Sequence, residues 1–439
     1  MRETIYQDDF LYNIAKVWVD WNMKQSYRKS QVHGKENIPT DGAILLAPNH
    51  CNTLMDALVI LRSYDRQTVF GARADIFNKP LIAKAMYFIR ILPMIRQRDG
   101  LRNVLKNKDT QETIVDTLEH NIRFCMYPEG THRAKHSLQA LGKGIFRAAL
   151  AANEKFGADR PIYIVPVGIE YGDYFRYRST SLVNYGKAIN VTEFLKELNL
   201  NNEAQAINAL SKELSSRMSE LMTYFKFDEN YDEKWALTKM LAIRYRKKGY
   251  GEFGTDLYED MLRNRKIASD IEKAMEEKPE QMAELLAEVK AFEKKRKKAG
   301  ISIYAFKKMY SPLMHATGKT FAAIIGLPYF LVSAVSNLPL WATSFFIRGK
   351  IRDKAFRNTV SYGVKLAMNT IFLPIIAILA FCLAPWWMAL AILALWIPGY
   401  AYFHDYIEGC RRLFSEIKLM RNRKLKENFR DIIKKYNNL

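Results

Sequence analysis

Two long runs without a charged side chain constrain the fold of this 439-residue chain more than any other feature. Residues 320–347 and 366–403 contain no Asp, Glu, Lys or Arg. At about 1.5 Å per helical residue, they reach roughly 42 Å and roughly 57 Å, whereas the hydrocarbon core of a bilayer is about 30 Å thick. The first run is therefore long enough to cross a membrane once and the second twice, which disfavours buried core helices of a soluble domain.

Breaks within the runs predict how they fold. Ala384 and Pro385 divide the second run, so we expect a membrane hairpin made of residues 366–383 and 386–403. Pro328, Asn337 and Pro339 interrupt the first run, which is either one tilted span or a re-entrant pair of short helices.

Positive charge flanks both runs and predicts their orientation. The loop 348–365 holds six Lys and Arg against one acid, and the tail 404–439 and the residues before the first run are also basic. Positive loops stay on the cytoplasmic side, so every flank is expected inside. This favours a re-entrant first run and an integral protein of the inner or cytoplasmic membrane whose soluble part faces the cytoplasm.

The overall charge agrees with a membrane partner. Lys and Arg number 67 against 46 Asp and Glu, a formal charge of +21, which is typical of proteins that bind nucleic acid or an anionic membrane surface. The cations lie beside the apolar runs and no nucleic-acid module is visible, so we expect membrane lipids as partners and no nucleic acid. Four scattered Cys exclude a disulfide framework, and no spacing suggests a metal site.

The remaining chain divides into four further parts. Residues 1–35 contain an amphipathic stretch, 8–30, expected to be a helix that lies on the membrane or packs on its own domain. Residues 36–225 alternate short apolar strands with helical stretches, which predicts an α/β domain. Residues 226–312 are expected to form a charged helical connector before the membrane segments 313–403, and 404–439 a basic tail. The expected strands are 43–47, 68–72, 123–127 and 162–169, and the expected helices are 113–121 and 144–156.

A histidine and an acid directly follow the first of these strands. His50 and Asp56 lie at the carboxyl end of strand 43–47, where sites of open α/β sheets occur. Six positions of regular helix would put the two side chains on different faces, so His50 is expected in the loop, with Asp56 folding back from the first helical turn. The alternative is a capping box formed by Thr53 and Asp56, which requires no catalysis.

A turn that follows another strand can bind an anion. In residues 127–133, a Pro and a Gly predict a tight turn, and Thr131 and Arg133 offer donors for a phosphate group. The alternative is an ordinary strand-to-loop turn. His132 and His136 are four residues apart, but no third ligand is evident, so solvated histidines are expected rather than a metal.

Two more segments, 89–98 and 165–169, would be structural on their own. In this order, however, the four segments resemble the glycerophosphate acyltransferase family with its His-Asp motif. Five residues separate His50 from Asp56, where the family has four. That spacing and the segment 71–75 are similar to the yeast-type branch that acylates glycerol-3-phosphate or dihydroxyacetone phosphate. The resemblance covers roughly residues 30–190.

The resemblance implies a fold and an activity. The fold would be a mixed sheet flanked by helices, followed by the helical connector and the membrane helices. The activity would be transfer of a fatty acyl group from acyl-CoA or acyl carrier protein to glycerol-3-phosphate or its 1-acyl form, without a cofactor. The alternatives are another acceptor, such as a lyso-aminolipid, and a lipid-binding protein without turnover; the oligomeric state stays open.

The resemblance also implies site residues. His50 would be the general base and Asp56 would orient it. His132 stands before Arg133 where the family has none, which puts the role of Arg133 in question. The residues that would bind the substrate phosphate are Arg96, Gly130, Thr131, Arg133 and Lys143, and those in supporting roles are Asn49, Glu129 and Arg73.

Overall fold

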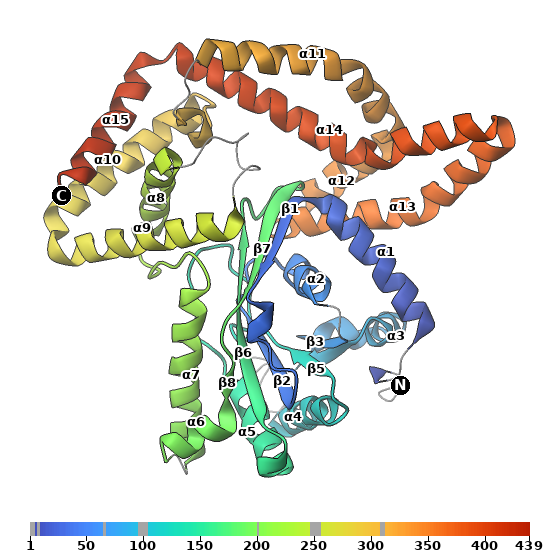
Figure 1. The fold of residues 1–439 in the computed structure, drawn as a ribbon, viewed down its shortest axis with the longest axis vertical. Helices are drawn as coiled ribbons and strands as arrows, with labels where there is room; N and C mark the ends of the chain where they lie inside the picture. Colours follow the sequence, from blue (N-terminus) through green and yellow to red (C-terminus); the bar gives the residue numbers. More distant parts are fainter. Residues whose placement is uncertain are drawn as a thin grey trace. The chain divides into compact units, whose positions relative to one another are not determined.

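The computed structural model describes residues 5–6, 9–64, 67–94, 104–199, 202–245, 256–307 and 312–439. The chain forms two compact units (Figure 1). The first comprises Met1–Met23, Ser30–Tyr174 and Ser181–Thr223, and the second comprises Lys24–Lys29, Phe175–Thr180 and Tyr224–Leu439.

The first unit is built on an eight-stranded mixed sheet, which confirms the predicted fold class. Five parallel strands lie in the order β6-β2-β5-β3-β4; β7 and β8 pair antiparallel with β6, and β1 lies beyond β7. The strands are β1 Tyr27–His33, β2 Ala43–Pro48, β3 Thr68–Arg73, β4 Ile91–Met94, β5 Arg123–Cys125, β6 Ile162–Tyr171, β7 Ser179–Tyr185 and β8 Ile189–Asn190.

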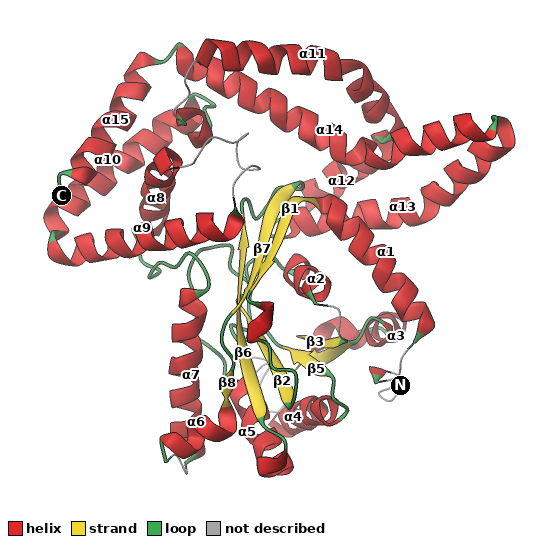
Figure 2. Cartoon of the chain, viewed as in Figure 1, coloured by secondary structure: helices red, strands yellow, loops and turns green. Residues whose placement is uncertain are grey.

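Helices flank the sheet (Figure 2). Every residue of the central strand β2 is buried, as expected of a parallel strand with both faces covered. The helices of this part are α1 Phe10–Ser26, α2 Leu54–Ser63, α3 Pro80–Phe88, α4 Val104–Glu119, α5 Gly144–Phe156, α6 Val191–Glu197 and α7 Glu203–Glu220, with short 3-10 turns at Lys35–Asn37, Ala74–Asn78 and Gly157–Asp159.

The order of the strands creates a topological switch point in this sheet. From β2 the chain proceeds outward to β3 and β4, then returns to β5 and crosses β2 to reach β6. Right-handed crossovers therefore send the connections that leave β2 and β5 to opposite faces. The carboxyl ends of these two neighbouring strands form the topological switch point, where open α/β sheets bind their ligands.

Three expectations about local structure need correction. The first helix ends at Ser26, because Tyr27–His33 pairs as strand β1, so the expected helix 8–30 is too long. Residues 126 and 127 lie beyond the end of β5. The strands β1, β7 and β8 have no counterpart among the expected elements. Phe10, Ile14 and Val17 of α1 are exposed, as an interfacial helix requires; that role stays a prediction.

Part of the second unit is a helical bundle with its own apolar core. The segment expected to be a charged connector forms α8 Tyr231–Tyr245, α9 Leu257–Glu277 and α10 Pro279–Lys298, followed by a 3-10 turn at Ile303–Phe306. The end of the basic tail joins this core as α15 Arg423–Asn437. Its apolar side chains repeat with helical spacing and are buried: Leu425, Phe429, Ile432 and Ile433.

The apolar runs form four helices: α11 Pro312–Ser336, α12 Leu338–Lys350, α13 Phe356–Leu383 and α14 Trp386–Met420. Within the described residues, three segments are long and apolar enough to span a membrane: Leu313–Ser336, Phe356–Leu383 and Trp386–Met420. Large side chains such as Phe321, Leu383 and Trp386 are 65%, 81% and 69% exposed. A lipid environment would remove this apolar surface from water.

Two breaks in these helices coincide with the expected ones. Asn337 separates α11 from α12, and Ala384-Pro385 separates α13 from α14. Helix α11 packs antiparallel along α14, because Lys319 forms an ion pair with Glu416 and the Tyr402 hydroxyl donates to the Gly326 carbonyl. The first apolar run therefore lies against the end of the expected hairpin and against the residues that follow it.

Candidate active site

His50 and Asp56 meet at the switch point of the sheet. His50 lies in the loop after β2, and Asp56 lies in the first turn of α2. The imidazole Nδ1 is 2.8 Å from the carboxylate Oδ2. Asp56 is fully buried, whereas the His50 side chain is 17% exposed. The pair thus has an inner acid and an outer ring that a substrate can reach.

Four further hydrogen bonds hold the Asp56 carboxylate in place. Its Oδ2 also accepts the backbone N–H groups of Cys51 and Asn52 at 2.8 and 2.7 Å. Its Oδ1 accepts the Tyr171 hydroxyl at 2.8 Å and the Cys51 thiol at 3.6 Å. An ionised carboxylate only accepts hydrogen bonds, so the neutral imidazole donates from Nδ1 and keeps the lone pair on Nε2. This tautomer is the one that a general base needs.

The alternative of a capping box is wrong. Thr53 has a φ of 48° and makes no side-chain cap hydrogen bond. Asp56 accepts the N–H groups of Cys51 and Asn52, which precede Thr53. The Asp56 carboxylate therefore holds the His50 loop in place and is not part of a capping box at the N-terminus of α2.

The loop after β5 supports the His50 loop. Glu129 Oε1 accepts the His50 N–H at 2.8 Å, and its Oε2 accepts the Gln139 N–H at 3.0 Å. The Arg133 N–H donates to the His50 carbonyl at 2.9 Å. The Tyr127 ring stacks on the imidazole, with 4.3 Å between centroids. Backbone and ring contacts together fix the direction of the imidazole.

Replacing Glu129 with Gln should destabilise the fold by about 1–3 kcal/mol, since the amide keeps one acceptor and turns an NH₂ group toward a buried N–H. Burial raises the pKa of Glu129, although the His50 and Gln139 N–H groups oppose this. The folded state thus binds more protons than the unfolded state between the two pKa values, and the stability of the wild type falls as pH rises through that window.

Chemical denaturation in detergent at several pH values measures both effects. Glu119→Gln is the control, because Glu119 is half exposed and pairs with Lys155 on the surface; its unfolding free energy should change by no more than about 0.5 kcal/mol. Equal stability of Glu129→Gln and the wild type would contradict the bridging role.

Three residues proposed for phosphate binding lie in the same loop. Gly130 has a φ of +68°, the left-handed region that favours glycine, and its N–H donates to the Tyr127 carbonyl. The Thr131 hydroxyl donates to Gln139 Oε1 at 3.2 Å. The Arg133 guanidinium donates to Ser137 and to the Leu138 carbonyl. These contacts order the loop, and Arg133 is already engaged by it.

The other proposed site residues lie outside residues 127–133. Lys143 is exposed at the N-terminus of α5, where the adjacent Gly142 N–H donates to the Pro128 carbonyl. Arg73 ends β3 and pairs with Asp75 at 2.6 Å on the surface. Asn49 ties β2 to β6 through two hydrogen bonds with the Ile169 backbone, at 3.1 and 2.6 Å. Arg96 lies outside the described residues.

The expectation of two solvated histidines holds only in part. His132 is partly exposed and contacts the His50 ring edge-on, with 5.7 Å between centroids. His136 is 2% exposed, and its Nδ1 lies 3.6 Å from Glu170 Oε1. Despite the cost of burial, His136 holds the pKa of the Glu170 carboxyl below its usual range. His136 is thus a buried partner of β6.

Two neighbours of the pair were missed from the sequence. Tyr171 contacts Asp56 from β6, and no local pattern indicates this, because the residues are far apart in the chain. Cys51 lies beside the acid, and burial, together with Asp56, raises the pKa of its thiol well above its usual value. A protonated thiol is a poor nucleophile, so we do not expect Cys51 to act in covalent catalysis.

Part of the chain is similar to known proteins. Residues 29–170 match the family model described as Acyltransferase, and no curated protein matches the chain. The solved 1-acyl-sn-glycerophosphate (LPA) acyltransferase, PlsC, from Thermotoga maritima is 17% identical, with a TM-score of 0.34, over 48% of this chain and 80% of that chain. His50 and Asp56 both lie within the residues that match this family model.

Proposed function

We propose that the protein is a membrane O-acyltransferase of phospholipid biosynthesis. It transfers a fatty acyl group from acyl-CoA or acyl carrier protein to glycerol-3-phosphate or 1-acylglycerol-3-phosphate. The observation that carries this proposal is the His50–Asp56 pair, oriented with Nε2 free to accept a proton, in an acyltransferase domain. The five-residue spacing of the pair favours the yeast-type glycerol-3-phosphate branch.

The proposed reaction is a direct transfer. The acceptor hydroxyl loses its proton to His50 Nε2 as its oxygen attacks the thioester carbonyl, and Asp56 stabilises the imidazolium that forms. The tetrahedral intermediate then expels the thiolate, which takes the proton from the imidazolium. An ester and a free thiol result. The acyl group never resides on the enzyme, which agrees with a protonated Cys51.

Cations would hold the phosphate of the acceptor. Arg96 and Lys143 are the proposed primary contacts, with Gly130 and Thr131 supplying donors and Arg133 maintaining the loop. The apolar helices would anchor the enzyme at the cytoplasmic face and give the fatty chain access to the bilayer. The basic composition suits acidic donors and anionic lipid.

A panel of acceptors tests the proposal. Purified protein in detergent is mixed with acyl-CoA or acyl carrier protein and with glycerol-3-phosphate, 1-acylglycerol-3-phosphate or a lyso-aminolipid. We expect thiol release with a phosphate monoester acceptor. Release with the lyso-aminolipid alone would reassign the acceptor, and an absence of release with any acceptor would overturn the enzyme assignment.

Replacing Arg96 with Gln should raise the KM for the phosphorylated acceptor roughly tenfold or more, with little change in kcat, because a charge-assisted contact to phosphate is lost. Arg147→Gln is the control, since Arg147 pairs with Glu203 on the surface of α5. Steady-state kinetics at saturating donor give both constants. An unchanged KM in the Arg96 variant would reject this role.

A further inference from the structure

Three residues stand at the ends of the uncharged runs. Arg348 directly follows 320–347, Lys365 directly precedes 366–403, and His404 directly follows it. If the second run crosses the bilayer twice, its two ends emerge at the same headgroup level. In the structure the charges that act on His404 are those of Arg348, Asp405, Arg178 and Lys365. Groups that are distant in the chain thus lie near one another.

Lys365 is a buried cation that has no acidic partner among the residues that the structure describes. Lys365 directly precedes the apolar part of α13, and the residue is 1% exposed. The ammonium donates to Gln25 Oε1 at 2.6 Å and lies 6.0 Å from the ring centroids of Tyr177 and Tyr400. Among the described residues, no carboxylate is within ion-pair distance of it. An amide and two rings leave most of its charge uncompensated.

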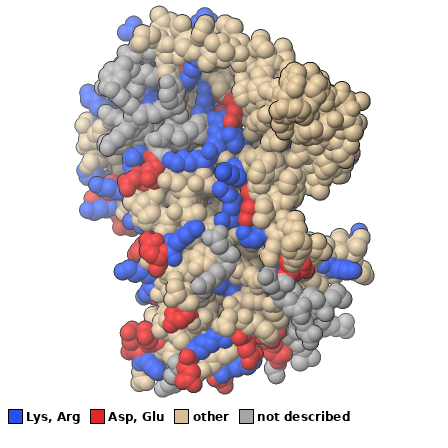
Figure 3. Space-filling view, turned by 45° about the vertical axis from the view of Figure 1, so that its right-hand side comes forward, with Lys and Arg blue, Asp and Glu red and all other residues tan. Residues whose placement is uncertain are grey.

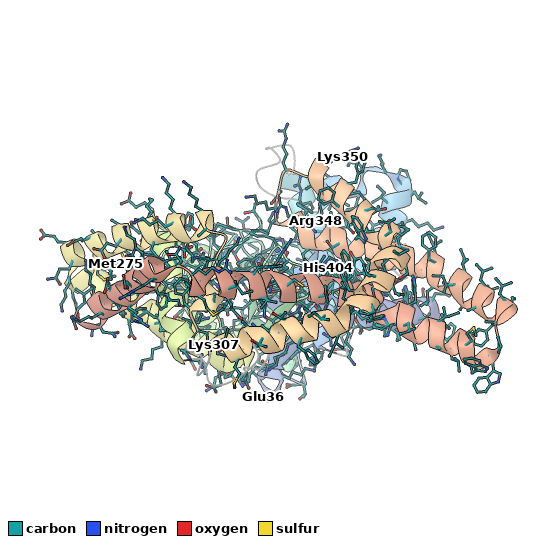
Figure 4. The ribbon with its side chains drawn as sticks, turned by 90° about the horizontal axis from the view of Figure 1, so that it is seen from above. Glu36, Met275, Lys307, Arg348, Lys350 and His404 are labelled. Atoms are coloured by element: carbon teal, nitrogen blue, oxygen red, sulfur yellow. The ribbon has the colours of Figure 1, made fainter. Side chains whose placement is uncertain are left out.

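Arg348 is a second such cation. It lies near the end of α12 and is half-buried. Burial lowers the pKa of its guanidinium, the nearby Arg357 and Arg411 lower it further, and Tyr400 opposes this. In Figure 4, Arg348 and His404 are labelled close together, whereas Lys350 lies farther out. Positive charge therefore accumulates beside His404.

The nearby carboxylate is already occupied. Asp405 accepts Arg28 Nε at 2.7 Å and Arg178 Nη2 at 2.8 Å. Asp405 thus pairs with Arg28 and Arg178, and among the described residues neither Arg348 nor Lys365 forms an ion pair with it. Half-buried or buried charges of one sign are costly without a counterion, so an anion would stabilise the cluster.

His404 supplies a polar group for that anion. Its Nε2 is buried and has no hydrogen-bond partner within the part of the chain that the structure describes. The ring is held between Tyr177 and Tyr400, with 5.0 and 4.8 Å between centroids. An imidazole N–H can donate to a phosphate oxygen, as can a guanidinium and an ammonium.

We propose that Arg348, Lys365 and His404 bind the phosphate of an anionic phospholipid. A lipid is favoured over free phosphate because the cluster adjoins apolar surface: Phe345 and Phe346 of α12 are 76% and 62% exposed. Figure 3 shows Lys and Arg gathered in a band beside a broad uncharged surface. Basic clusters at the cytoplasmic ends of membrane helices bind such headgroups. The site shares no residue with the proposed catalytic pair.

Native mass spectrometry of the full chain tests the site. Protein is released from nanodiscs of equimolar phosphatidylcholine and phosphatidylglycerol, and the retained lipids are counted. The wild type should keep phosphatidylglycerol in preference to phosphatidylcholine. Arg348→Gln and Lys365→Met should weaken its retention roughly tenfold or more. Lys350→Gln is the matched control, because Lys350 is exposed two residues further along α12 and lies over Phe346.

Three results would overturn the proposal. They are a wild type without preference, an Arg348→Gln variant that retains lipid as Lys350→Gln does, and displacement of phosphatidylglycerol by inorganic phosphate, which would assign the site to a soluble anion. Should the buried Lys365 variant fail to fold, the half-buried Arg348 and a His404→Phe variant carry the same test, with circular dichroism to verify their helices.

Discussion

Replacing His50 with alanine should lower acyl transfer by about 10²–10⁴-fold or more, because the acceptor hydroxyl then loses its base. The fold should persist. The His50 backbone N–H and carbonyl keep their bonds to Glu129 and Arg133, and Asp56 keeps the Cys51, Asn52 and Tyr171 donors. Acyl transfer by protein in detergent, normalised to folded protein, measures the loss.

The control is His120→Ala. His120 is nearly half exposed and stacks on Tyr6, away from the switch point. Its variant should retain wild-type activity and an unchanged KM for the donor. Full activity in the His50 variant would refute the assignment of the base, whereas an unfolded His50 variant would contradict the claim that backbone contacts hold this loop.

Replacing Asp56 with asparagine should lower kcat by about 10²–10⁴-fold while the KM for the donor changes little. The amide has the size of the acid but presents an NH₂ group to the ring or to the loop N–H groups. The ring then loses the partner that fixes the proton on Nδ1 and stabilises the imidazolium. The loop should also be less stable, since a buried acceptor is lost.

The Tyr171→Phe variant separates two effects of Asp56, which are the orientation of the His50 imidazole and the stability of the loop. It removes another hydrogen bond of the same carboxylate, the one to Oδ1, and leaves the His50 contact intact. We expect a similar loss of unfolding free energy, about 1–3 kcal/mol, but less than about tenfold loss of kcat. If both variants lose activity equally, Asp56 acts through packing of the loop rather than through the imidazole.

The sequence predicts best what depends on local pattern. The apolar runs 43–47 and 68–72 form β2 and β3, and helix 144–156 has the bounds of α5. The spacing of His50 and Asp56 excludes one helical face, and a loop-to-helix arrangement is observed. Length alone identifies the apolar helices, because a bilayer imposes a minimum span.

The remainder depends on contacts between distant segments. The strand YRKSQVH shows no alternation of apolar and polar residues and becomes β1 through its pairing with the sheet. The positive φ of Thr53 cannot be inferred from its identity, and it is what removes the capping box. Tyr171 reaches Asp56, and His136 is buried against Glu170, only after β6 is placed beside β2.

The time course of thiol release tests the central claim most directly. Purified protein is mixed with a long-chain acyl-CoA, first alone and then with glycerol-3-phosphate or 1-acylglycerol-3-phosphate. Direct attack by a deprotonated hydroxyl predicts no thiol without acceptor, and steady release matched by ester once acceptor is added. A burst of thiol equal to the enzyme concentration before acceptor is added, or no release after it, would contradict general-base catalysis by His50.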